Sequence, residues 1–264
     1  MSLDSFGAII KSALIAGLGA GMVVAAVQFV WTEPIVDRAI SIEEQLHAAE
    51  HNHAAGAGST EATEEPPPVV DRPTQKKGLF LGYAIYGVAW GLLFGAAYTI
   101  GQNKLPGAGR TGRGLALAAA SYWSIGLLPF LKYPANPPGV GDPDTIDFRQ
   151  HIYLILLVCG ILAVGIAVAM RQWATGRRRL KMAIWLPVAW LALASALLYF
   201  GLPNNTDAIR TPMPLVNEFR LHSLAGITLF WLVVGCAFGP LLAWTAGLPA
   251  RVARPAPTAA TIRS

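Results

Sequence analysis

The sequence carries five histidines, and three of them lie in one short polar stretch that is also rich in acidic residues. If this stretch is helical, Glu43, His47 and His51 recur at intervals of four residues and share one face. Imidazole and carboxylate are suitable ligands for divalent first-row metals such as cobalt, nickel and zinc. We therefore predict metal ligands at Glu43, His47, Glu50, His51 and His53. The alternative interpretation is a solvated amphipathic segment that holds no metal.

A second pattern, in which an acid is followed by Phe, Arg, any residue and His, occurs twice, from Asp147 to His151 and from Glu218 to His222. At helical spacing the acid of each copy reaches its histidine. We predict that these four residues are metal ligands and that Arg149 and Arg220 are positioning groups. The alternative needs no metal, because acids favour a helix N-terminus and arginines at a membrane interface extend toward phosphate.

A proline-rich loop at residues 132–141 is the third feature. Its three prolines predict a stiff, extended segment that serves as a lid or partner-docking surface, and a plain connector is the alternative. The residues assigned to positioning or partner contact here are Lys132, Tyr133, Pro134, Asn136, Pro137 and Pro138.

The elements that must position these residues are six segments without Asp, Glu, Lys or Arg. They cover residues 12–31, 78–100, 114–131, 152–170, 182–200 and 223–248. Each is close to the roughly 20 residues that span a bilayer, and in lipid the backbone must satisfy its own hydrogen bonds. The chain is 54% hydrophobic and only 13% charged, against about 25% charged in soluble domains. We predict an all-α polytopic membrane protein with six transmembrane helices.

Charge sorting predicts the orientation of these helices. If both termini are cytoplasmic, one side holds twelve of the 20 basic residues and a single acid, Asp4. This agrees with the positive-inside rule and predicts a multi-pass protein of the inner, cytoplasmic membrane whose outer face carries the histidines. The basic loops are then explained by anionic lipid, and no nucleic-acid partner is expected.

The six helices form three hairpins along the chain, and the similar motifs before the fourth and sixth helices indicate that hairpins two and three are duplicates. We predict one transmembrane domain over residues 1–248, with an outer acidic loop at 32–77. Within that loop the first part, from Glu33 to about His53, is expected to be helical, and residues 54–74 are expected to be disordered. The tail at 249–264 is expected to be a disordered cytoplasmic segment. Glycines at helical spacing, such as Gly17 with Gly21, predict close helix packing.

The proline loop, together with Arg149, Tyr153 and the Phe219-Arg220 pair, resembles the family of predicted cobalt transporter components called CbtA. The glycine-rich first helix and the acidic stretch behind Trp31 also resemble it. The resemblance covers nearly the whole chain apart from residues 54–74 and the tail, although members are usually described with about five spans. It implies cobalt uptake for cobalamin synthesis, alongside a small single-span, histidine-bearing membrane subunit of the CbtB type.

The leading functional hypothesis is therefore a membrane component of a divalent metal uptake transporter, with cobalt or nickel as the transported ion and no bound cofactor. The alternative is a non-transport scaffold or metal-sensing accessory subunit that binds a partner at its outer surface. That alternative explains why no carboxylate or histidine lies in mid-span. An enzyme is not expected, because the sequence has no nucleophile with its base, no nucleotide-binding loop and no cofactor attachment motif.

Overall fold

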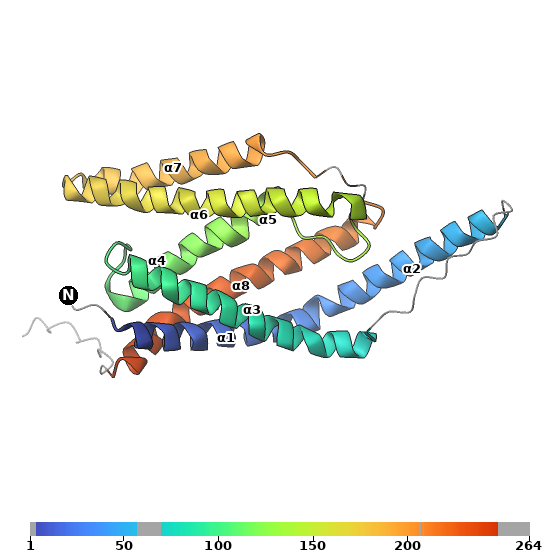
Figure 1. The fold of residues 1–264 in the computed structure, drawn as a ribbon, viewed down its shortest axis with the longest axis horizontal. Coiled ribbons are helices and arrows are strands. Elements are labelled where there is room, and N and C mark those ends of the chain that lie inside the picture. Colours follow the sequence, from blue (N-terminus) through green and yellow to red (C-terminus); the bar gives the residue numbers. More distant parts are fainter. Residues whose placement is uncertain (1–3, 57–69, 206, 208, 248–264) are drawn as a thin grey trace, which may run out of the picture.

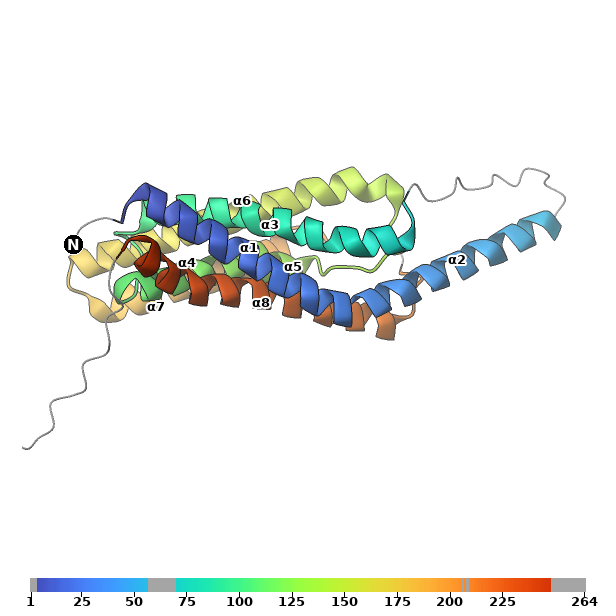
Figure 2. The same cartoon turned by 90° about the horizontal axis from the view of Figure 1, so that it is seen from below.

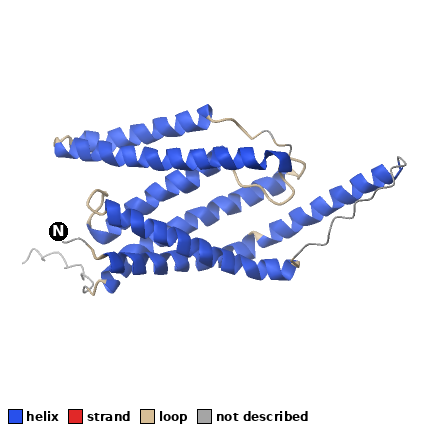
Figure 3. Cartoon of the chain, viewed as in Figure 1, coloured by secondary structure: helices blue, strands red, loops and turns tan. Residues whose placement is uncertain are grey.

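A computed structural model describes residues 4–56, 70–205, 207 and 209–247, with side chains at all of these positions except 47, 49–56 and 143. Every regular element within these ranges is a helix, so the predicted all-α class is confirmed (Figure 3). The elements are α1 (Phe6–Trp31), α2 (Glu33–Gly56), α3 (Arg72–Gly101), α4 (Gly109–Ser121), the π-helix η1 (Tyr122–Leu127), α5 (Leu128–Lys132), the 3₁₀-helix η2 (Pro143–Thr145), α6 (Ile146–Gly176), α7 (Leu180–Gly201) and α8 (Met213–Thr245).

Six helical segments in the described part of the chain are long and apolar enough to cross a bilayer, which confirms the predicted number of spans. They are α1, α3, the continuous run from α4 through η1 to α5, α6, α7 and α8. Because six is even, the start of α1 and the end of α8 lie at the same end of the bundle (Figure 1). We call this end, with the α3–α4 and α6–α7 turns, the basic end. The opposite end, where α6 and α8 begin, is the histidine end.

The helices do not pack in the order of the predicted hairpins. The first hairpin is present, because α1 packs along α3, but α1 also packs along α8, and α8 packs along α4. The main neighbour of α7 is α6 rather than α8, so the third predicted hairpin is not a packing unit. Figure 1 shows α6 and α7 side by side at one edge of the bundle and α1 with α3 at the other, while α8 runs obliquely between them. Hydrophobic patterning alone does not distinguish these neighbours, since each span is apolar on all sides.

Glycines allow α1 and α3 to approach closely. A Cβ atom at Gly17 would overlap the carbonyl oxygen of Gly87, and one at Gly91 would lie 2.6 Å from the carbonyl oxygen of Ala13. The same arrangement recurs between α8 and α4, where a Cβ at Gly235 would lie 2.9 Å from that of Ala118. The predicted small-residue packing faces are therefore confirmed. Such close contact replaces the hydrophobic effect, which does not drive association between helices in lipid.

The third span contains a π-helical turn at Tyr122–Leu127, immediately before Pro129. A proline inside a helix removes one backbone hydrogen bond and collides with the carbonyl group four residues earlier. In membrane helices a local π adjustment can satisfy the freed backbone groups. The backbone at Ser124 lies against Gly160 of α6, where a Cβ would meet the Ser124 carbonyl oxygen at 2.8 Å. This contact helps to join the α6–α7 pair to the remaining helices.

Helix α2 follows α1 after the single residue Thr32 and extends away from the bundle (Figure 2). The predicted helix behind Trp31 is thus confirmed. The segment predicted to be disordered, residues 54–74, overlaps α2 at residues 54–56 and α3 at Arg72–Thr74. Pro73 suits the first turn of a helix, and ion pairs of Arg72 hold that turn against α2. The rest of that segment, 57–69, and the tail at 249–264 lie outside the described residues.

Candidate functional site

The first predicted constellation lies on α2. The helical backbone puts positions 43, 47 and 51 on one face, as the spacing predicted. The side chains of His47, Glu50, His51 and His53 lie outside the described part, so only Glu43 can be placed in detail. Glu43 packs against Gly139 of the proline loop, where a Cβ atom would lie 3.0 Å from the Glu43 carboxyl carbon. Helix α2 therefore passes directly over the proline loop.

An ion-pair cluster joins the base of α2 to the start of α3. Arg72 Nη2 lies 2.5 Å from the Glu33 carboxylate, and its Nε lies 2.9 Å from Asp37. Lys76 Nζ is 2.6 Å from the other oxygen of Asp37. The hydrogen bond from Lys76 is the main reason that the pKa of Asp37 lies below its ordinary value, and Arg72 lowers it further. These two acids are therefore neutralised within the chain.

The second constellation differs in detail from the predicted acid–histidine pairs. His151 Nδ1 is 2.5 Å from the backbone carbonyl oxygen of Asp147, not from its carboxylate. The Glu218 carboxylate accepts a hydrogen bond of 2.9 Å from Arg38 of α2, so its partner is an arginine rather than His222. Both motifs lie on helices, as their spacing predicted. The spacing carries no information about Arg38 of α2, which forms an ion pair with Glu218.

His222 lies on α8 beside the end of α1. Its ring lies 5.9 Å from that of Trp31, and its Nδ1 atom is buried without a hydrogen-bond partner among the described residues. Gln28 of α1 is only 6% exposed and lies beside His222, with its Nε2 atom 3.5 Å from the His222 carbonyl oxygen. The Gln28 amide oxygen accepts a hydrogen bond of 2.7 Å from Thr32. The Gln28 amide thus lies against the backbone of α8 at His222, where α1 meets α8.

Each arginine of the repeated motif contacts the loop that precedes the helix of the other arginine. Arg149, on α6, donates to Asp207 at 3.0 Å, and Asp207 belongs to the loop that precedes α8. Arg220, on α8, donates to Asn136 at 2.8 Å, and Asn136 belongs to the loop that precedes α6. Burial by itself would raise the pKa of Asp207, but hydrogen bonds from Thr145 and the Asp142 backbone, with the charge of Arg149, bring it below its ordinary value.

The first residues of the proline loop form hydrogen bonds with the end of α7 and the segment between α7 and α8. Lys132 Nζ donates to the Tyr199 carbonyl oxygen at 2.7 Å and to Asn204 at 2.6 Å. The Tyr133 hydroxyl donates to the Pro203 carbonyl oxygen at 2.6 Å. Pro137 is fully buried, whereas Pro138 is exposed. The loop is therefore fixed to the segment between α7 and α8 as well as lying beneath α2.

Within the described side chains, no three His, Cys, Asp or Glu residues converge on one point that could hold a metal ion. Asp147, His151, Glu218 and His222 belong to the same end of the bundle but do not form one such cluster. The histidine end can therefore offer separate one- or two-ligand contacts from these residues. Such contacts suit transient capture better than a closed structural site, which requires about four ligands for a metal such as zinc.

Two cavities lie near the histidine end. The first, of about 530 Å³, lies among α1, α3 and α8, and its polar lining consists of Gln28, Tyr83, Tyr86 and Ser223. The second, of about 650 Å³, lies between the proline loop and α6. Its polar lining consists of Tyr133, Asn136, Arg149, Gln150, Tyr153 and Asn205. Neither cavity has an imidazole or a carboxylate in its lining, which makes both of them a poor match for a bare cation.

A column of aromatic rings continues from the first cavity toward the basic end. Tyr86 and Phe230 are in contact at its start, with ring centroids 5.1 Å apart. Phe238 and Tyr98 are in contact at its finish, with centroids 4.7 Å apart. Successive contacts at 5.0–6.3 Å join these pairs through Trp231, Trp90 and Phe94. The column fills the space between α3 and α8 and leaves the centre of this bundle apolar.

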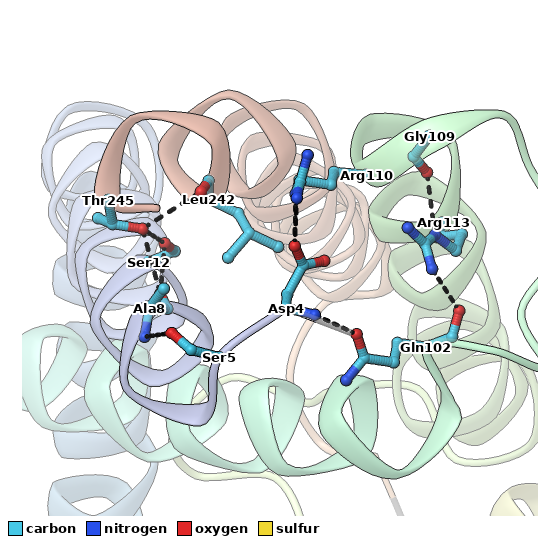
Figure 4. A network of polar contacts seen from close by, with 10 residues as sticks. All are labelled: Asp4, Ser5, Ala8, Ser12, Gln102, Gly109, Arg110, Arg113, Leu242 and Thr245. Carbon is cyan, nitrogen blue, oxygen red and sulfur yellow. Dashed lines mark hydrogen bonds and ion pairs between the residues drawn. The ribbon is translucent and has the colours of Figure 1, made fainter. Parts of the chain in front are cut away.

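Polar contacts close the basic end beyond Tyr98 (Figure 4). Asp4, whose side chain is 3% exposed, accepts a hydrogen bond of 2.6 Å from Arg110 Nε. The Asp4 backbone donates to the Gln102 side chain at 3.1 Å, and Arg113 donates to the Gln102 carbonyl oxygen at 2.7 Å. Ser12 and Thr245, 2.7 Å apart, join α1 to α8 beside this network. Asp4, the single acid of the basic end, thus joins the segment before α1 to α4, and we call the Asp4–Arg110 pair the lock.

The sequence analysis did not single out Tyr83, Ser223 or the Asp4–Arg110 pair. A signal for the first two was present, since polar side chains inside an uncharged span are unusual and tend to face the protein interior. No local signal identified Asp4 and Arg110, which are separated by more than one hundred residues.

The model of a family described as probable cobalt transporter subunit (CbtA) matches residues 6–243 of the chain. The match includes all six spans almost completely, and the chain therefore belongs to the CbtA family. Comparison with curated proteins and with solved structures gives no match.

Proposed function

We propose that this CbtA-family subunit takes up divalent cobalt from outside the cytoplasmic membrane, in support of cobalamin synthesis. In this proposal the histidine end faces outward and the basic end faces the cytoplasm. The distribution of charge supports that orientation, because arginine and lysine dominate the short loops at the basic end. The membrane potential then assists inward movement, by about 4.6 kcal/mol for a dication at 100 mV.

The observation that carries the proposal is α2, a helix that continues α1 beyond the bundle. Its register gives Glu43, His47 and His51 one face, with His53 and Glu50 close by. These ligand types suit cobalt or nickel, and a helix held at one end presents them without a closed cage. Helix α2 therefore serves as the capture element.

Captured ion then passes to His151 and His222 at the mouths of α6 and α8. Several outer acids already have cationic partners in the chain, namely Glu33, Asp37, Asp207 and Glu218. Glu43 and Asp147 have no ion pair with a described basic side chain and remain available to a metal. Arg149 and Arg220 act as positioning residues, because their contacts fix the two loops around the mouth.

A small single-span, histidine-bearing subunit of the CbtB type completes the transporter. The proline loop, from Lys132 to Pro138, is the proposed contact for that partner, since it is rigidly tied at its base and has exposed positions at its tip.

Accumulation of radioactive cobalt in cells that express the chain with and without the partner tests the function. The double change His47→Ala and His51→Ala should raise the half-saturating cobalt concentration and leave the maximal rate unchanged. Ser41→Ala, on the same helix, is the matched control, because its exposed hydroxyl donates only to the Arg38 carbonyl oxygen. Absence of cobalt uptake even with the partner present would contradict the proposal and favour a scaffold.

A further inference from the structure

The cavity of about 650 Å³ between the proline loop and α6 has a polar part and an apolar part. Arg149 and Gln150 lie just ahead of the uncharged stretch of α6, which begins at residue 152. Leu154 and Leu157 line the cavity from inside that stretch. Leu154 is 58% exposed on the surface of α6, so the lining is in part accessible from the surrounding lipid. The cavity therefore extends from the depth of the lipid headgroups to the first part of the acyl chains.

The polar part offers hydrogen-bond donors. The Asn136 amide oxygen accepts from Arg220, and the Asn205 amide oxygen accepts from the backbone N–H of Asp207. Both of these partners can only donate, so the orientation of the two amides is fixed, and neither NH₂ group has an acceptor among the described residues. Arg149 adds further N–H groups, and its Nε atom is buried without an acceptor in the described chain. A group rich in acceptor oxygens, such as phosphate, fits this lining.

Positive charge lies close to this donor set. Arg149 is balanced by Asp207. Arg220, which contacts Asn136 of the cavity wall, and Lys132, which precedes the wall residue at position 133, donate to neutral oxygens. Neither of these two cations forms an ion pair with a carboxylate in the described part of the chain. An anionic group in the cavity would thus lie near two cations that have no counter-charge there.

A phosphate carried by a lipid fits this cavity better than a soluble anion does. On the water side, Asp142, Asp144 and Asp147 are exposed and do not belong to the lining, so their charges disfavour the approach of a free anion. On the lipid side the surface at Leu154 is apolar. Apolar side chains such as Leu157 also line the cavity, and they match an acyl chain, which inorganic phosphate lacks.

We propose that this cavity is a phospholipid-binding site. The phosphodiester group lies at Asn136, Asn205 and Arg149, and the first part of an acyl chain lies against Leu154 and Leu157. The bound lipid fills the space between the proline loop and α6 at the histidine end. This site goes beyond cobalt uptake and does not depend on it.

Photo-cross-linking tests the site on the purified chain in a maltoside detergent, which carries no phosphate. The probe is phosphatidylglycerol with a photoreactive group near the carboxyl end of one acyl chain, and diacylglycerol with the same chains is the control lipid. Mass spectrometry of the proteolytic peptides should find phosphatidylglycerol on residues 146–157 several-fold more often than diacylglycerol. Equal labelling by the two lipids would overturn the proposal, because it would show an apolar groove that does not recognise phosphate.

Asn136→Asp separates lipid binding from packing. It removes the donating NH₂ group and keeps the oxygen that accepts from Arg220. The new carboxylate pairs with Arg220, so the melting temperature should not fall, but it repels phosphate, so labelling should fall to the level of diacylglycerol. Asn204→Asp is the matched control, because it makes the same change beside Lys132 at a position that does not line the cavity. Its labelling should equal that of the parent chain.

Asn205→Asp is a second variant, and it decides the matter if the Asn136 variant loses stability. It keeps the oxygen that accepts from the Asp207 N–H and removes only the NH₂ group, so it should also reduce labelling. Undiminished labelling in both cavity variants, or an equal loss in Asn204→Asp, would overturn the proposal.

Two further comparisons identify other occupants. Labelling should persist in an excess of inorganic phosphate, and its loss would show a site for a soluble anion instead. It should also be the same with and without the partner subunit, and its loss on addition of the partner would make the cavity part of a protein interface. All of these measurements are made without cobalt. Failure of the lipid site therefore leaves the proposed function standing, and absence of cobalt uptake leaves the lipid site standing.

Discussion

The Arg149 guanidinium lies 3.0 Å from the Asp207 carboxylate, which is only 3% exposed. This contact joins α6 to the loop that leads into α8. Arg220 makes the reciprocal contact with Asn136, from α8 to the loop that leads into α6. The two copies of the repeated motif thus perform the same task on each other's loop. The duplication of the two segments stays a prediction, with which these reciprocal contacts agree.

We predict that Arg149→Ala lowers the melting temperature in detergent by several degrees, because it leaves a buried carboxylate without its cation. Arg149→Lys should restore only part of the loss, since an ammonium group does not reproduce the paired geometry of a guanidinium that also donates to the Asp142 carbonyl oxygen. Arg38→Ala is the control and should change the melting temperature little, because the Arg38–Glu218 pair is exposed. Equal effects of Arg149→Ala and Arg38→Ala would contradict the assigned role of the buried pair.

The Asp207 contact also predicts a pH dependence. The pKa of Asp207 in the folded protein lies below its ordinary value, so its carboxylate contributes stability at any pH above the ordinary aspartate range. That contribution falls as the pH drops through the lowered pKa and the group is protonated. The stability difference between the parent protein and Asp207→Asn should therefore be constant at neutral pH and shrink only below about pH 4. A difference that already disappears near pH 6 would show that another group is responsible. Thermal unfolding at a series of pH values makes the comparison.

The six spans were predictable because a bilayer imposes one strong rule on every segment, which is that charges are excluded and backbone hydrogen bonds are satisfied internally. Helix α2 was predictable from its polar, helix-favouring composition behind Trp31. Which helices pack against one another was not predictable, because α6, α7 and α8 are all apolar around their circumference. Which of them are neighbours depends on shape, for example on Gly160 receiving the π-turn at Ser124.

The candidate ligands were only partly predictable. Helical spacing correctly brought Asp147 and His151 within one turn, yet the imidazole bonds the backbone carbonyl of Asp147. The pairing of Glu218 with Arg38 depends on the angle at which α2 leaves the bundle at Thr32, and residue spacing carries no information on that angle. The cavity at Gln28 needs three helices to form, so no single segment of sequence indicates it.

Two glycines on α1 supply a test of helix packing. Gly17→Ala adds a methyl group that would overlap the Gly87 carbonyl oxygen, so α1 and α3 must separate, at a cost of about 1–3 kcal/mol. Gly19→Ala adds the same methyl group where nothing lies within 4 Å. That change should be neutral or stabilising by up to about 1 kcal/mol, because alanine favours the helix. Unfolding in detergent measures both. Similar stability of the two variants would mean that α1 and α3 are not held in close contact.

The lock at the basic end gives the last prediction. Asp4, just before α1, and Arg110, on α4, form an ion pair that must break if the bundle opens between these two segments at this end. Asp4→Asn or Arg110→Gln alone leaves one charge without its partner, whereas the double change replaces the ion pair by two neutral groups that can still share a hydrogen bond. The penalty for an unpaired buried charge exceeds that for a neutral pair, so the double variant should be closer to the parent than either single variant is.

Tyr98→Cys reports on this opening, since Tyr98 is fully buried behind the lock. The measurement uses inside-out vesicles and a chain in which the native Cys159 and Cys236 are replaced by alanine. With the lock intact, Tyr98→Cys should react slowly with an impermeant thiol reagent. The reaction should be several-fold faster with Asp4→Asn or Arg110→Gln and slower again in the double variant. Ser12→Ala offers a control, because it breaks the Ser12–Thr245 hydrogen bond at the same end without leaving a charge exposed to an apolar environment. If Ser12→Ala increases the reaction as much as Arg110→Gln does, general loosening of the helix ends explains the exposure, and the Asp4–Arg110 pair has no particular gating role.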